Sequence, residues 1–403
     1  MKRINLVKSL IIAGGLAVST PELTAQSSAA EKLVNQEAYP EFSWDRIPQY
    51  MHIRKATAYT PEEIKFLSKF PLITFEKSNG HKSYGSTEKG TLIAARAVKK
   101  INPKTKILYY RNVIVHYGSY AANEILDSMP NALLKDSKGN EKLIRKRVEA
   151  YDLSNAEVRD WWVKNCKKMT SDPAIDGIFL DGNIKALEPG YLKRDIGVDK
   201  KTETIAGYHQ MMKETREAIG PKELMLSNII RARFENGGLE YLNYFDGSYL
   251  EGFFHTVGKV SREDYVAKGI ESMQKAAKQG KIIAFTTGFH TGKNNSKMGI
   301  DESHSEVASH EEARKALNYP LGIFLVCAEK YSYFRVHEGY AADKNDRWMR
   351  HLDEYDRPLG APKGPAKKTG YIYTREFEHA SVKLDIVKQT ADIKWDKSSN
   401  KKH

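Results

Sequence analysis

Short apolar runs alternate with amphipathic segments from about residue 50 to residue 336. The runs are six to eight residues long, rich in Ile, Leu, Phe and Tyr, and bounded by polar or turn-forming residues, a pattern typical of strands buried on both faces. The ranges that predict strands are 49–54, 71–76, 105–112, 175–181, 223–228, 246–251, 281–286 and 330–335.

The intervening segments carry helix signals. Thr60-Pro-Glu-Glu63 offers an N-cap, a proline at the first position and an acidic first turn, and Ser154-Asn-Ala-Glu157 has the spacing of a capping box. Further helices are predicted over about 87–101, 205–219 and 309–326. Each predicted helix lies between two predicted strands.

Eight strands that alternate with helices favour a parallel sheet covered on both faces, hence an α/β fold. An open doubly wound sheet would usually carry a glycine-rich dinucleotide or phosphate loop near its start, and neither motif occurs in the sequence. We therefore predict a (β/α)₈ TIM barrel over residues 40–340.

Beyond residue 340 the pattern changes. A Pro/Gly-rich loop around 358–365 leads into alternating runs at 370–377 and 380–386, joined by a tight turn, and a third run ends at Trp395. We interpret residues 341–396 as this loop and a small β appendage, too short for an independent domain. Residues 397–403 form a basic tail.

The first 30 residues resemble an export signal. Lys2, Arg3 and Lys8 precede the apolar run 9–18, and small residues cluster at 24–30. We predict a signal peptide followed by the start of the mature chain, and no stable membrane insertion after its removal, because the run is too short to span a bilayer. Periplasmic and extracellular destinations both remain open.

The charge balance bears on the partner. A formal net charge of +13 and a pI of about 9.3 favour polyanions, such as a sulfated or uronic polysaccharide, although a solvated lysine-rich surface would give the same balance. The sequence has no zinc-finger spacing and no RNA-binding aromatic signature, so we do not expect a nucleic-acid partner. Cys166 and Cys327 lie in apolar helical segments, which predicts buried thiols and leaves a disulfide open.

In a (β/α)₈ barrel the active site lies at the carboxyl ends of the strands. Asp181 and Glu251 end the fourth and sixth predicted strands, and each is followed by a glycine that lets the chain turn away. Glycosidic cleavage needs a proton donor and a second carboxylate that attacks or activates water. We predict this pair to be catalytic; the alternative is that either residue caps a helix or pairs with an arginine.

Other residues at the strand ends and in the segment before the first strand suit sugar binding, because they are amides, aromatic rings and cations. The predicted substrate-binding residues are Trp44, His52, Glu76, Lys77, Tyr110, Arg111, Asn112, Asn183, Asn228, Tyr249, His255, Thr286 and Arg335. Lys77, Arg111 and Arg335 would hold a carboxylate or sulfate. The histidine clusters of a hydrolytic zinc site are not found, and we expect no metal and no cofactor.

Several segments together resemble the hypothetical glycosyl hydrolase family fifteen, which is distinct from the glucoamylases. They are Trp44-Asp-Arg-Ile-Pro48, His52-Ile-Arg54, the strand end at Glu76, Asp176–Asp181, Glu251-Gly-Phe-Phe254 and Tyr373-Thr-Arg-Glu-Phe377, spread over about residues 40–395. The resemblance implies a (β/α)₈ barrel in an exported polysaccharide-degrading system, without a defined substrate or catalytic assignment. Barrel α-galactosidases are similar in placing a nucleophile on strand four and an acid/base on strand six, which would make Asp181 the nucleophile and Glu251 the acid/base.

The sequence therefore predicts a secreted glycoside hydrolase that acts on a polysaccharide or oligosaccharide. A polysaccharide lyase is one alternative, with Tyr110 or His255 as the base and Arg111 beside a uronate. A noncatalytic carbohydrate-binding barrel is another, and nucleic-acid hydrolysis is a more distant one, because no acidic metal cluster is evident.

Overall fold

The computed structural model describes residues 36–251, 260–288, 309–336, 341–343 and 347–396. The predicted signal peptide, the basic tail and His255 lie outside the described residues. Within these ranges, no helix has the combination of length and hydrophobicity that crossing a bilayer requires.

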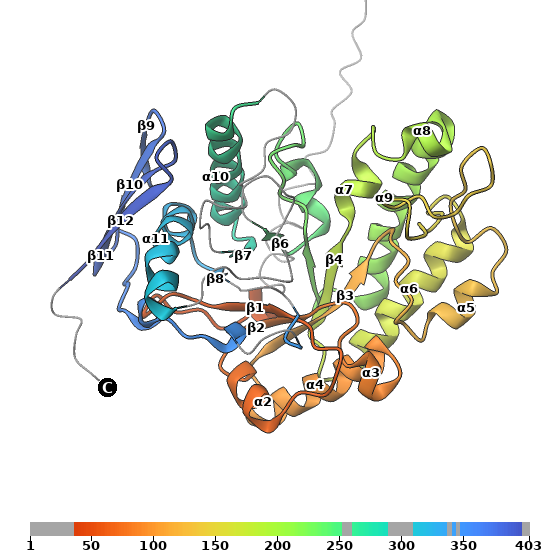
Figure 1. The fold of residues 1–403 in the computed structure, drawn as a ribbon, viewed down its shortest axis with the longest axis horizontal. Coiled ribbons are helices and arrows are strands. Elements are labelled where there is room, and N and C mark those ends of the chain that lie inside the picture. Colours follow the sequence, from red (N-terminus) through yellow and green to blue (C-terminus); the bar gives the residue numbers. More distant parts are fainter. Residues whose placement is uncertain (1–35, 252–259, 289–308, 337–340, 344–346, 397–403) are drawn as a thin grey trace, which may run out of the picture.

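Eight parallel strands form one sheet in which every strand pairs with its neighbour in the sequence. The sheet curves into a nearly closed barrel, and β8 returns to the start of β1 through a parallel bridge between Phe334 and Gln49 (Figure 1). Its strands are β1 Tyr50–Ile53, β2 Leu72–Phe75, β3 Lys106–Asn112, β4 Gly177–Asp181, β5 Leu224–Ser227, β6 Gly247–Leu250, β7 Ile282–Thr287 and β8 Ser332–Val336. The predicted (β/α)₈ barrel is confirmed.

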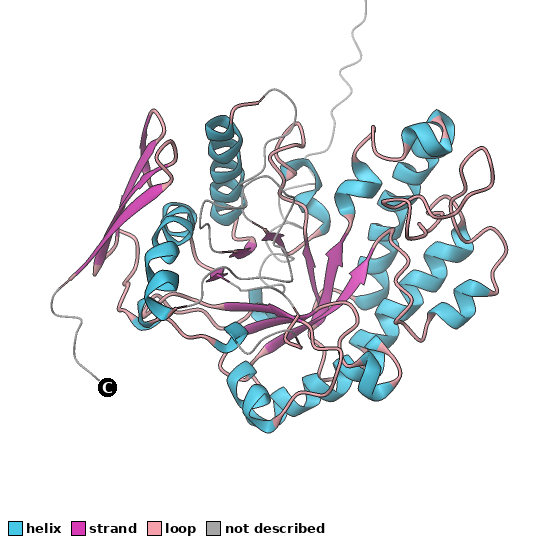
Figure 2. Cartoon of the chain, viewed as in Figure 1, coloured by secondary structure: helices cyan, strands magenta, loops and turns pink. Residues whose placement is uncertain are grey.

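Helices connect the strands and surround the barrel (Figure 2). The long ones are α4 Thr87–Ile101, α6 Ala156–Thr170, α9 Val198–Ile219, α10 Arg262–Lys278 and α11 His310–Cys327. The short ones are α2 Pro61–Leu67, α3 His81–Tyr84, α5 Asn123–Asp127, α7 Asn183–Leu187, α8 Lys193–Ile196 and the 3₁₀ turns η1 Leu239–Tyr244, η2 Arg347–Met349 and η3 Asp353–Asp356. Each long helix buries one apolar side on the sheet, which is why the strands read as continuous apolar runs.

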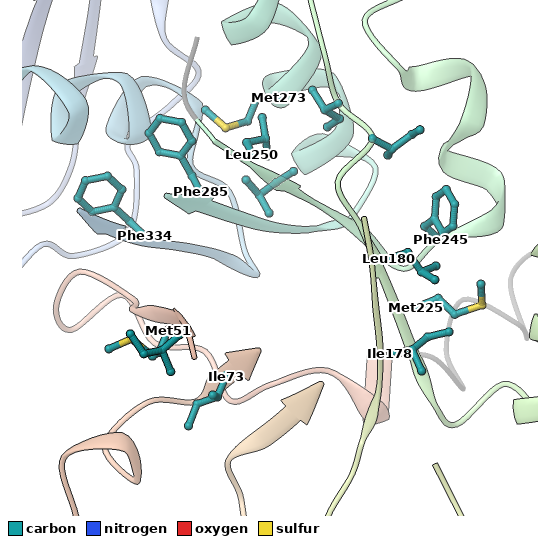
Figure 3. Close-up of a cluster of buried hydrophobic side chains, with 14 of the residues drawn as sticks. Met51, Ile73, Ile178, Leu180, Met225, Phe245, Leu250, Met273, Phe285 and Phe334 are labelled. Carbon is teal, nitrogen blue, oxygen red and sulfur yellow. The ribbon is translucent and has the colours of Figure 1, made fainter. Parts of the chain in front are cut away.

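The barrel has two layers of buried side chains because successive residues of a strand face opposite sides. Tyr50, Phe179 and Tyr249 belong to the cluster that fills the interior. The outer face of the strands packs beneath the helices, and Figure 3 shows part of that layer, including Met51, Ile73, Ile178, Leu180, Met225, Leu250, Phe285 and Phe334. The interior is therefore a packed core, and ligands have access only at its ends.

The C-terminal residues form a separate antiparallel sheet of four strands in the order β12-β11-β10-β9. The strands are β9 Lys367–Thr369, β10 Ile372–Glu376, β11 Ala380–Asp385 and β12 Thr390–Trp395. One face packs on α11, with buried Val382 and Leu384 in the main core (Figure 1). This sheet corresponds to the predicted appendage, with β9 as a strand that the pattern did not indicate.

The amino ends of the strands are covered by residues 36–44. The Tyr39 hydroxyl donates to the carbonyl of Asp246, directly before β6, and the Tyr333 hydroxyl donates to the carbonyl of Pro40. The Phe42 ring packs against Tyr331 and Tyr333, at the start of β8. This end of the barrel is closed, so the opposite end, where the strands finish, is the one to search for a site.

Local capping agrees with the sequence at most helix starts. Thr60 and Glu63 form the capping box of α2, and α4 has the predicted bounds. At α6 the prediction was one residue early: Asn155, rather than Ser154, caps the helix and accepts from the amide of Glu157. Cys166 and Cys327 are buried free thiols on α6 and α11, which rules out the disulfide that the sequence left open.

Candidate active site

Asp181 is the last residue of β4, and its position depends on the glycine that follows. Gly182 has φ +80°, a left-handed conformation that costs a residue with a Cβ free energy. A Cβ at Gly182 would also collide with the side-chain amide of Asn112. Glycine is therefore required for the chain to leave the strand while Asp181 faces the barrel mouth.

The Asp181 carboxylate is half-buried and receives three side-chain hydrogen bonds. The Tyr110 hydroxyl donates to Oδ2 at 2.6 Å, the Asn112 amide to the same oxygen at 3.4 Å, and the Asn228 amide to Oδ1 at 3.2 Å. Burial alone would raise the pKa of Asp181, but the charges of Lys185 and Lys77 and the Tyr110 hydrogen bond hold this pKa below its ordinary value. The group is an oriented, ionised carboxylate at neutral pH.

Removing the Tyr110 hydroxyl tests this hydrogen bond. In Tyr110→Phe the pKa of Asp181 rises toward its usual range, because the ionised form loses its shortest hydrogen bond. We expect the acidic limb of the pH–rate profile to move to higher pH, with kcat/KM at pH 7 falling roughly tenfold. Tyr109→Phe is the matched control, since the Tyr109 hydroxyl donates to Asn165 on the outer side of the same strand. Equal pH profiles for the two variants would contradict the role of Tyr110.

Glu251 follows β6 and, like Asp181, is partly exposed. Its Oε2 accepts from Arg231 Nη2 at 2.6 Å, and 36 % of its side chain is exposed to solvent. Lys185 and Arg231 each lie within electrostatic range of both Asp181 and Glu251, so the two carboxylates share one mouth. The structure thus brings the predicted pair to the same end of the barrel, in different surroundings.

Glu76 is a third carboxylate at this end of the barrel, but both of its oxygens form ion pairs. Its buried side chain pairs with Lys77 and with Arg54 Nη1 at 3.0 Å, and His52 Nε2 lies 3.9 Å away. Burial would raise the pKa of Glu76, yet the neighbouring cations hold it well below the usual range. A carboxylate held ionised in this way is unsuited to donate a proton, and we assign Glu76 to the framework of the site.

Glu76→Gln should destabilise the fold by about 3 kcal/mol at pH 7, because Arg54 and Lys77 keep their charges and lose the buried partner. The folded-state pKa of Glu76 is lowered, so its stabilisation is complete above the unfolded carboxyl pKa of about 4.3 and is lost as pH falls further. Urea denaturation at pH 7 and in acid would measure the difference, which should shrink in acid. Glu41→Gln breaks an exposed pair with Lys104 and should change little at either pH.

An aromatic floor lies beneath the carboxylates. The His52 ring stacks on Tyr249 at 4.8 Å, Phe179 meets both rings edge-on, and Thr286 Oγ1 donates to the Tyr249 hydroxyl at 2.8 Å. His52 Nδ1 is bonded to the Tyr50 hydroxyl, which orients the imidazole. His52, Tyr249 and Thr286 therefore lie in the interior layer of the barrel, and all three are almost fully buried. Their role in substrate binding stays a prediction.

Two predicted residues point away from the site. The Arg111 guanidinium lies on the helix side of β3, 4.6 Å from the Tyr120 ring and 5.1 Å from that of Trp161. The Asn183 side-chain amide donates hydrogen bonds to the backbone carbonyls of Leu180 and Asn228, and its oxygen accepts one from the Tyr208 hydroxyl. Both predictions of substrate binding are corrected: residues next to an inward-facing neighbour on a strand face outward, and the Asn183 amide satisfies buried backbone groups.

Arg335 and Trp44 are also removed from the candidate set. The Arg335 guanidinium is buried over Phe70, at 5.0 Å, and donates to Gln49 Oε1 and to two backbone carbonyls. Trp44 belongs to the segment that covers the amino ends of the strands, where its ring packs on Phe42 and Phe377. Neither side chain approaches the carboxylates.

Three cations near the carboxylates were missed from the sequence. Lys185 lies on α7, Arg231 follows β5, and Arg145 belongs to the long excursion after β3. Burial lowers the pKa of Lys185, and the charges of Arg145 and Arg231 lower it further. The charges of Asp181 and Glu251 raise this pKa but do not restore its ordinary value. Lys185 comes four residues after Asp181, in the first turns of the helix that follows β4, a signal that the sequence did offer. Within the described ranges, no group of His, Cys, Asp or Glu residues could hold a metal ion.

Together, the fold and the site define a class of enzyme. A parallel eight-stranded barrel with two carboxylates in one polar, aromatic mouth has the architecture of a barrel glycoside hydrolase. The chain belongs to the hypothetical glycosyl hydrolase family 15, whose sequence profile matches residues 99–381, more than half of the chain. It is thus a glycoside hydrolase.

No curated protein matches this sequence. Among solved structures, the glycoside hydrolase domain of PelA from Pseudomonas aeruginosa is similar at 11 % identity and a TM-score of 0.41, over 60 % of this chain and 84 % of that one. The GH36 alpha-galactosidase AgaA from Geobacillus stearothermophilus is similar at 9 % identity and a TM-score of 0.47, over 87 % of this chain and half of its own. An Anoxybacillus alpha-amylase is similar at 9 % identity and a TM-score of 0.46, over 85 % of this chain and 87 % of that one. These likenesses say nothing about substrate or catalytic residues.

Proposed function

We propose that this protein is an exported enzyme that hydrolyses glycosidic bonds of a polysaccharide or oligosaccharide, with Asp181 and Glu251 as its catalytic carboxylates. The observation that carries the proposal is the setting of Asp181: a half-buried, ionised carboxylate at the tip of β4, oriented by Tyr110, Asn112 and Asn228. A developing oxocarbenium ion needs a fixed negative charge beside its anomeric carbon.

The two carboxylates suit different roles. Asp181 is half-buried and held ionised by hydrogen bonds and nearby cations, which suits a nucleophile. Glu251 is partly exposed and pairs with Arg231, and this exposure gives its carboxyl group access to solvent protons and to a leaving oxygen. With these roles the anomeric configuration is retained, and proton NMR of the first product would show this.

The alternative of a lyase has less support from the same residues. Burial and the Asp181 charge raise the pKa of Tyr110 well above its ordinary value, which makes this tyrosine a poor base. Arg111, the proposed partner of a uronate, lies on the helix side of β3. A noncatalytic carbohydrate-binding barrel would not need Asp181 to be held ionised at the end of β4.

A glycan panel tests the proposal. The purified protein is incubated with neutral, uronic and sulfated polysaccharides, and reducing ends and ultraviolet absorbance are followed together. We expect new reducing ends without absorbance, and none from Asp181→Asn. Absorbing products would identify a lyase, whereas binding without turnover across the panel would identify a binding barrel. The basic charge of the chain supports an anionic glycan as substrate.

A further inference from the structure

The mouth of the barrel carries more positive than negative charge. Around the three carboxylates Glu76, Asp181 and Glu251, the described chain gathers five cationic side chains. They are Arg54, Lys77, Arg145, Lys185 and Arg231. Arg54 and Lys77 pair with Glu76, and Arg231 pairs with Glu251. Arg145 and Lys185 are the two without such a pair.

Lys185 is the inner of these two cations. Its side chain is half-buried beside Asp181, and its ammonium makes no ion pair or hydrogen bond with any residue that the structure describes. The charges of Arg145 and Arg231 act on it from two other loops, and like charges brought together in a poorly solvated place repel one another. Asp181 and Glu251 attract this ammonium, but beside the three cations Lys185, Arg145 and Arg231 the two carboxylates leave a net positive charge. The negative charge of a ligand would balance it.

Arg145 is the outer cation and is presented by a strained turn. It lies between Ile144 and Val148, which form an antiparallel bridge, and both Arg145 and Lys146 have left-handed backbones, with φ +52° and +55°. Glycine or asparagine is the usual choice for such positions. Two charged residues there store backbone strain, which tends to be found at binding sites. The Arg145 guanidinium, too, has no ion pair among the described residues.

Aromatic hydroxyls complete the surroundings. The charge of Arg145 acts on Tyr117 and Tyr191 as well as on Lys185. Tyr191 also feels the charges of Glu188, Arg233 and Asp195. The Tyr117 ring also lies under Lys77, at 5.6 Å, which connects the entrance with the Glu76 cluster. Two cations and nearby phenol donors from separate loops match the oxygens of a tetrahedral or planar oxyanion.

We propose that Lys185 and Arg145 form a subsite for an anionic substituent of the sugar, a sulfate ester or a uronate carboxylate, next to the catalytic carboxylates. The assignment rests on the proposed function for its substrate. It replaces Arg111 and Arg335, which the sequence had suggested for this purpose and which lie elsewhere. Bound there, the anion neutralises the repulsion between the two cations and fixes the sugar relative to Asp181.

Titration with inorganic sulfate tests the subsite without turnover. Calorimetry at constant ionic strength would compare the wild type with Lys185→Gln and Arg145→Asn, and with Lys213→Gln as a control that removes an exposed charge from α9. We expect saturable binding to the wild type and to the control, and at least tenfold weaker binding to the other two. Free glucuronate titrated in parallel shows whether sulfate or carboxylate is preferred.

In Arg145→Asn, weaker sulfate binding would not be explained by a loss of stability, because asparagine tolerates the left-handed backbone better than arginine. Its melting temperature should not fall below that of the wild type. The absence of saturable binding to the wild type, or equal binding by all four proteins, would overturn the subsite.

Kinetics separate this proposal from the proposed function. For a sulfated oligosaccharide and its desulfated parent, the ratio of their kcat/KM values should fall at least tenfold in Lys185→Gln and Arg145→Asn; an unchanged ratio for both variants would also overturn the subsite. Asp181→Asn should lose turnover while still binding sulfate. Retained turnover in Asp181→Asn would contradict the proposed catalytic pair. The sulfate titration would then be the test of the subsite.

Discussion

Asp181→Asn is expected to lower kcat/KM by about a thousandfold or more, equivalent to roughly 4 kcal/mol of transition-state stabilisation. The physical reason is that an amide supplies neither the nucleophile nor the negative charge opposite the oxocarbenium ion. The fold should persist, since the amide oxygen still accepts from one of the donors Tyr110 and Asn228. The loss in stability should be about 1–2 kcal/mol for the donor left facing the new amide nitrogen.

Asp176→Asn is the matched control for this variant. Asp176 lies just before the same strand, at the closed end, where it pairs with Lys99 at 2.7 Å and Lys106 at 3.4 Å. Its replacement should cost stability and leave kcat unchanged. Comparable loss of activity in the two variants would show that Asp181 acts through the fold.

A nucleophile also makes a chemical prediction. In Asp181→Gly, added azide should restore cleavage of an activated glycoside and give the glycosyl azide of inverted configuration, because the small anion enters from the face that the carboxylate had occupied. NMR of the product identifies the anomer. A product of retained configuration would assign this role to another residue.

Glu251→Gln has the second largest expected effect. We expect kcat/KM to fall by about 10²–10⁴ for a substrate whose leaving group needs protonation, and far less for an aryl glycoside with an acidic leaving phenol. Glutamine keeps an oxygen for Arg231 but cannot deliver a proton. Kinetics on two such substrates therefore separate an acid/base from a residue that only binds. A uniform loss on both would contradict the acid/base role.

The control for Glu251 lies nearby. Glu188 Oε2 lies 2.6 Å from Arg233 Nη2, the same distance as in the Arg231–Glu251 ion pair, and both pairs are partly exposed. Glu188→Gln removes an equivalent ion pair and should leave the dependence on the leaving group unchanged. If it behaves like Glu251→Gln, the electrostatic field of the mouth, rather than proton transfer, would explain both results.

The site shows which errors sequence reasoning could have avoided. Tyr110, Arg111 and Asn112 cannot all face the mouth, because adjacent residues of a strand point to opposite sides. Tyr110 and Asn112 bond to Asp181 or to each other, and Arg111 lies among aromatic rings under the helices. Alternation alone excludes the middle residue once its neighbours are placed inside. Trp44 needed more information, because its end of the barrel is decided by how residues 36–44 pack beneath the strands.

By itself the sequence determined the eight strands, their alternation with helices and hence the barrel, because apolar runs and caps are local signals that burial on both faces enforces. It also determined that Asp181 ends a buried strand before a glycine. Only the tertiary structure decided which cations meet at the mouth. Lys185, Arg231 and Arg145 come from three connections whose paths depend on packing, and a charge in a loop has no periodicity that indicates its partners.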